Sequence, residues 1–95
     1  MQEIDVRSEP QDDGWLFQVA VSEGRGRTAH RVTMTDEVYR RLSGAACPPE
    51  KVVRRSFEFL LEREPKESIL PEFDITAIAR YFPEYEAEIA RRTGR

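Results

Sequence analysis

The sequence predicts an α+β domain in which a three-stranded antiparallel β-meander is followed by three to four helices packed on one face of the sheet. Hydrophobic residues alternate with polar ones through the first third of the chain, and the period then changes to that of helices. A later run, 49–63, carries an apolar arc wide enough for two neighbours. At 95 residues, we expect the whole chain, 1–95, to form a single domain.

Three segments show the alternation of half-buried strands, at 3–8, 15–22 and 28–34. The middle one has the strongest pattern, and its apolar face consists of Trp15, Phe17, Val19 and Val21. Segment 9–14 is rich in residues that break strands and predicts a turn or loop, while 23–27 contains two glycines and predicts a tight hairpin. We therefore expect a sheet with one apolar face and one face toward water.

The helices begin at Thr35, which is a good N-cap for a short helix that stops at Gly44. The central helix, 49–63, has Pro49 in its first turn, and Pro65 prevents it from continuing. Segment 66–71 is expected to form at most one helical turn. We expect the apolar side chains after this helix to fold back onto the core, namely Ile69, Leu70 and Phe73.

Asp74 predicts the start of a further helix, because its side chain can accept a hydrogen bond from the first turn. The apolar positions that follow have helical spacing: Ile75, Ile78, Ala79 and Phe82. Pro83 then removes a hydrogen bond and clashes with the preceding turn. We favour a break with a second helix starting at Pro83 over one kinked helix.

The charge balance argues against some partners. Fifteen Lys and Arg residues against 18 Asp and Glu residues give a net charge of −3, which does not favour nucleic acid or anionic membranes. No apolar run approaches the roughly 20 residues that span a bilayer. The first residues lack the pattern of a signal peptide, so the sequence predicts a cytoplasmic protein without membrane association.

Four stretches are similar to those of a known group of proteins. They read FEFLLEREPKESIL at 57–70, FD at 73–74, RYFPEY at 80–85 and HRVT at 30–33. Together they resemble a family of short bacterial proteins of unknown function. The resemblance implies a small single-domain bacterial protein and assigns no site residues.

His30 and Cys47 are the only histidine and the only cysteine. His30 could be a general base, or Cys47 could pair with it as a thiolate dyad. We favour the structural alternatives, a hydrogen-bonded strand histidine and a small buried cysteine, because functional titratable groups usually occur in clusters. Zinc spacing, phosphate loops and nucleophile elbows are absent from the sequence. We therefore predict no enzyme activity, no cofactor and no metal site.

Two binding surfaces are predicted. Arg25, Arg27 and Arg31 form a basic hairpin tip that could meet phosphate groups. Strand 28–34 is the less charged edge of the expected meander, so another strand could pair there, beside Ala29, Arg31 and Thr33. The alternative is that 81–89 covers this edge.

From these surfaces we predict a non-catalytic protein-interaction or regulatory module that binds a protein partner or itself. The alternative is a regulator that binds nucleic acid or phosphate through the hairpin tip.

Overall fold

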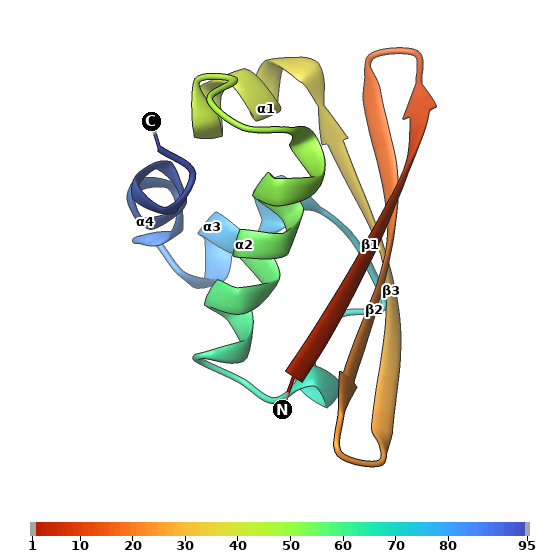
Figure 1. Cartoon of the computed structure of the whole chain (residues 1–95). Helices are drawn as coiled ribbons and strands as arrows, with labels where there is room; N and C mark the ends of the chain where they lie inside the picture. Colours follow the sequence, from red (N-terminus) through yellow and green to blue (C-terminus); the bar gives the residue numbers. More distant parts are fainter. Residues whose placement is uncertain (1, 95) are drawn as a thin grey trace.

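The computed structural model describes residues 2–94, which form a sheet with all of the labelled helices on one side of it (Figure 1). The elements are, in order, β1 (Gln2–Gln11), β2 (Gly14–Glu23), β3 (Gly26–Thr35), α1 (Asp36–Ser43), α2 (Pro49–Leu61), β4 (Glu72–Asp74), α3 (Ile78–Tyr81) and α4 (Tyr85–Arg92). Two 3-10 turns lie at Lys66–Ser68 and Ile75–Ala77. The predicted α+β class, with the helices after the meander, is confirmed.

The antiparallel meander β1–β2–β3 is confirmed, with longer strands than expected. The turn predicted within 9–14 is present but shorter than expected, because β1 continues to Gln11 and only Asp12 and Asp13 form it. Pro10 is tolerated within β1 because this strand is an edge of the sheet, where a missing N–H costs no ladder bond. Gly24, with φ of 58°, supplies the left-handed residue of the second hairpin.

The expected three-stranded meander needs a correction, since β4 makes the sheet four-stranded and mixed, in the order β1-β2-β3-β4. β4 runs parallel to β3 and pairs Glu72, Phe73 and Asp74 with residues 31–33. The Arg31 N–H donates to the Pro71 carbonyl at 2.8 Å, and the Thr33 hydroxyl donates to Asp74 at 2.7 Å.

The expected open edge of strand 28–34 is therefore wrong at 31–33, where β4 already occupies it. The alternative cover, 81–89, is also wrong, because the residues that pair there are 72–74. Most of segment 81–89 belongs to α4, which packs on α2 and α1.

The core lies between the apolar face of the sheet and α2. In Figure 1, α2 lies between the sheet and α4, so it has a neighbour on each side, as its wide apolar arc requires. Its fully buried apolar residues are Val52, Val53, Phe57 and Phe59. The Tyr85 hydroxyl lies 2.6 Å from the Ser56 hydroxyl and joins α4 to α2 by a buried hydrogen bond.

The helix ends follow the signals in the sequence. The Thr35 hydroxyl accepts from the Val38 N–H at 3.2 Å, and Gly44 ends α1 in the left-handed conformation. The predicted break near Phe82 is confirmed, because Phe82 is non-helical with φ of −131° and ψ of 89°. α4 begins at Tyr85, two residues after Pro83. Within residues 2–94, no helix has the length and apolar character needed to cross a membrane.

Candidate functional site

An apolar groove of about 400 Å³ opens between the end of α2 and α3. We call it the α2–α3 groove, and its lining residues are Leu60, Glu64, Ser68, Ile69, Leu70, Phe73, Ala77, Ile78, Tyr81 and Phe82. Its volume lies within the range of about 300–1,000 Å³ that is usual for ligand sites. The groove can therefore hold one or two large apolar side chains of a partner.

Leu70 and Tyr81 are the two large hydrophobic residues that stand exposed within residues 2–94. Leu70 is 48% exposed and Tyr81 is 69% exposed, and both line the groove. The prediction that Leu70 folds onto the core is wrong, whereas Ile69, at 5% exposure, does so. Two exposed apolar side chains at one groove form a patch of the kind that marks interaction surfaces.

Leu70 is held outward by its backbone. The Leu70 carbonyl accepts a hydrogen bond from His30 Nδ1 at 2.8 Å, and the next carbonyl, that of Pro71, accepts from the Arg31 N–H. Both carbonyls thus bind β3. The Ile69 side chain enters the core, and the Leu70 side chain stands exposed at the groove.

The wall of the groove formed by α3 is positioned by Asp74. Its carboxylate accepts from the Thr76 N–H at 3.1 Å and from the Thr76 and Thr33 hydroxyls. Burial alone would raise the pKa of Asp74, but these hydrogen bonds, with help from Arg80, hold it below its ordinary value. The carboxylate is therefore ionised at neutral pH and fixes the turn that leads to Ile78 and Tyr81.

Glu64 is the one charged residue among those that line the groove. It lies just after α2 and is half-buried. Its carboxylate has no hydrogen bond or ion pair to any residue within 2–94. A half-buried anion beside an apolar surface favours a cationic group on whatever binds there.

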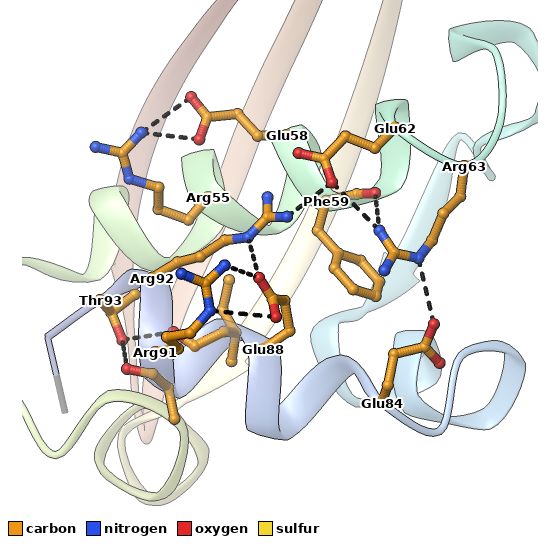
Figure 2. A network of polar contacts seen from close by, with 12 residues as sticks. Arg55, Glu58, Phe59, Glu62, Arg63, Glu84, Glu88, Arg91, Arg92 and Thr93 are labelled. Atoms are coloured by element: carbon orange, nitrogen blue, oxygen red, sulfur yellow. Dashed lines mark hydrogen bonds and ion pairs between the residues drawn. The ribbon is translucent and has the colours of Figure 1, made fainter.

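Behind the groove, a polar network ties α2 to α4 (Figure 2). Arg92 donates to Glu62 at 2.7 Å and to Glu88 at 2.9 Å. Arg63 lies over the Phe59 ring, 3.6 Å from its centroid, and reaches Glu84. Hydrogen bonds from Arg91 and Arg92 lower the pKa of Glu88 to about 2. The network also reaches the groove, because Phe59 packs edge-on against Phe82, with ring centroids 5.8 Å apart.

The residues predicted to bind lie elsewhere. Arg25 is at the exposed tip of the β2–β3 hairpin, and the other four follow β3 on the face away from the helices: Arg27, Ala29, Arg31 and Thr33. Acidic groups accompany them. The Arg31 guanidinium lies 3.7 Å from Glu72, and Thr33 is bonded to Asp74. Arg27 lines a hollow of about 570 Å³ together with Glu3, Asp5 and Arg54.

His30 and Cys47 are both buried side chains, and they do not contact each other as a catalytic pair would. His30 is 3% exposed, with Nε2 at 2.9 Å from the Thr28 hydroxyl and the ring against Phe57. Both ring nitrogens therefore have a partner other than Cys47. Cys47 is 9% exposed, and burial raises the pKa of its thiol. Within residues 2–94, no three His, Cys, Asp or Glu side chains cluster as metal ligands would.

Comparisons with protein-family models, curated proteins and solved structures give no match to this chain. The family and bacterial origin implied by the resemblance at 57–70 therefore stay predictions.

The groove could not be predicted from the sequence, because most of its apolar residues have the pattern of core residues. One signal was available: Tyr81 falls outside the apolar stripe that contains Ile78 and Phe82, so a large aromatic residue had no place in the core. Glu64 gave no signal, since one carboxylate before a proline is ordinary for a helix end.

Proposed function

We propose that this chain is a non-catalytic protein-interaction module whose binding surface is the α2–α3 groove. One observation carries the proposal: the two exposed large hydrophobic residues, Leu70 and Tyr81, lie at the same apolar groove. Burying such side chains against a partner removes apolar area from water, at about 25 cal/mol per Å².

The size of the groove supports a transient partner. A cavity of about 400 Å³ holds one or two large side chains and not a whole protein face. Interfaces below about 1,200 Å² of total buried area are typical of weak signalling contacts. We expect a short segment of another protein, bound with micromolar affinity, and we expect this to occur in the cytoplasm.

The basic hairpin tip is the weaker candidate. Nucleic acid binding requires a contiguous basic face. Arg31 faces Glu72, and Arg27 shares a hollow with Glu3 and Asp5, so carboxylates interrupt the row of cations on β3. This supports the groove over the hairpin tip as the binding surface.

A peptide selection tests the proposal. A random 12-residue peptide library on phage is selected against the wild-type protein, and the selected peptides are then measured against Leu70→Asp with Tyr81→Asp. Both residues are exposed, so this variant should fold. Binding should weaken at least about tenfold, as expected for loss of two anchor side chains.

Ala29→Asp is the matched control, because it adds a negative charge to an exposed residue on the opposite face of the sheet. It should leave the affinity unchanged. Peptides that bind both variants like the wild type, or that lose binding only to Ala29→Asp, would contradict the proposal.

A further inference from the structure

β4 forms an edge of the sheet beside the groove. The strand order places it last, and Phe73, at its centre, lines the groove and packs its ring against Phe57. In a parallel ladder, alternate residues direct both backbone groups to the same neighbour. The Arg31 N–H donates to the carbonyl before Glu72, so Phe73 faces β3 and Glu72 faces outward.

The opposite edge of the sheet is protected. In β1, the Arg54 guanidinium donates to the Ile4 carbonyl, and Pro10 has no N–H to offer. β4 has neither device within its three residues, Glu72–Asp74. No strand within residues 2–94 pairs with its outer edge, and a further strand added there would lie along the α2–α3 groove.

We propose, on the basis of the function proposed above, that the groove binds an extended, basic segment of another protein that adds to β4 as a fifth strand. Successive side chains of a strand point to opposite faces, so residues two apart share a face. One side chain on the helix side enters the apolar groove beside Leu70 and Tyr81. A side chain two positions away meets the Glu64 carboxylate.

The segment that fits has a large apolar residue and a lysine or arginine two positions apart. The charge follows from Glu64, the one charged lining residue, whose carboxylate has no partner within residues 2–94. The net charge of −3 favours the approach of such a segment. Backbone bonds to Glu72 and Asp74 provide affinity, and the groove and Glu64 provide specificity.

Three measurements on the peptides selected above test this inference. The selected sequences should contain an apolar residue and a lysine or arginine at spacing two. Glu64→Gln should weaken their binding about threefold to fivefold and reduce its salt dependence. The control Glu37→Gln, which removes the same charge from an exposed position of α1, should have no effect. In a selection against Glu64→Lys, acidic residues should replace the basic ones.

Backbone geometry is tested on the peptide itself. Methylating single backbone nitrogens should abolish binding at one position, or at two positions that are two residues apart, and should spare the position between them, since only alternate amides of an added strand face β4. Peptides that depend on Leu70 and Tyr81, but whose alanine scan has helical spacing or which ignore Glu64→Gln, would overturn this inference and leave the proposed function standing. A failure to obtain any groove-dependent peptide would overturn both. If the free protein forms a dimer, and Tyr81→Asp dissociates that dimer, this inference is also overturned, since a second copy of the chain would then occupy the groove.

Discussion

His30 in β3 donates a hydrogen bond from Nδ1 to the Leu70 carbonyl at 2.8 Å, across 40 residues of sequence. A carbonyl oxygen only accepts, so Nδ1 carries the hydrogen, and in the neutral ring Nε2 accepts from the Thr28 hydroxyl. The only histidine of the chain thereby fixes the backbone that presents Leu70 to the groove.

His30→Phe should lower the free energy of unfolding by about 1–3 kcal/mol, because the Leu70 carbonyl loses its donor at a partly buried site. Thr28→Val removes only the second bond and should cost less. Urea denaturation gives both values, and amide exchange of Arg31, which is bonded to Pro71, should accelerate in His30→Phe alone. Equal losses in the two variants would show that the Leu70 bond has no special role.

Phe57→Ala should cost about 3–5 kcal/mol, the usual range for truncating a buried phenylalanine. Phe57 is fully buried against His30 and Phe73. Tyr81→Ala is the comparison, and because Tyr81 is 69% exposed its cost should stay within about 0.5 kcal/mol. Chemical denaturation measures both. A large loss of unfolding free energy for Tyr81→Ala would mean that Tyr81 stabilises the fold, which would contradict its assignment to a binding surface.

Gly14→Ala should destabilise the protein more than Gly24→Ala. A Cβ at Gly14 would lie 2.1 Å from the Met34 carbonyl oxygen, so the β1–β2 turn would have to move away from β3. Gly24 has open space but a left-handed backbone, where a side chain costs about 1–2 kcal/mol. The urea midpoints of the two variants decide, and the reverse order would contradict the close approach at Gly14.

The polar network between α2 and α4 should make the free energy of unfolding fall at acidic pH. The folded pKa of Glu88 is about 2 against an ordinary 4.5, and the hydrogen bond from Arg92 also lowers that of Glu62. Below 4.5 the unfolded chain therefore binds more protons than the folded one. The stabilisation is present above 4.5 and is lost as the pH falls toward about 2. Glu88→Gln should flatten this fall in urea midpoints measured across the window, and an unchanged slope would contradict the assignment.

The strands and helices could be predicted because their signals are local. The alternation through Trp15–Val21, the cap at Thr35 and Pro83 each act within a few residues. β4 could not be predicted, because the three residues Glu72–Asp74 are too few to show a period, and their pairing depends on the return of the chain from α2.

The groove was hidden for a related reason. Leu70 and Ile69 are both apolar, and the hydrogen bonds from β3 to the Leu70 and Pro71 carbonyls hold Leu70 outward while Ile69 enters the core. The spacing of residues in the sequence does not predict a contact between residues so far apart in the chain. Of the candidate residues on β3, Arg27, Ala29 and Arg31 are exposed and Thr33 is half-buried, but the neighbouring carboxylates of Glu72 and Asp74 come from a strand that was not foreseen.

The most direct test of the central claim is a map of backbone amide shifts, recorded by NMR while labelled protein is titrated with a selected peptide. The largest changes should fall on residues 64–82, with the Glu72 and Asp74 amides among them. Changes centred instead on Arg25 to Thr33, along the outer face of β3, would contradict it and return the hairpin tip as the binding surface.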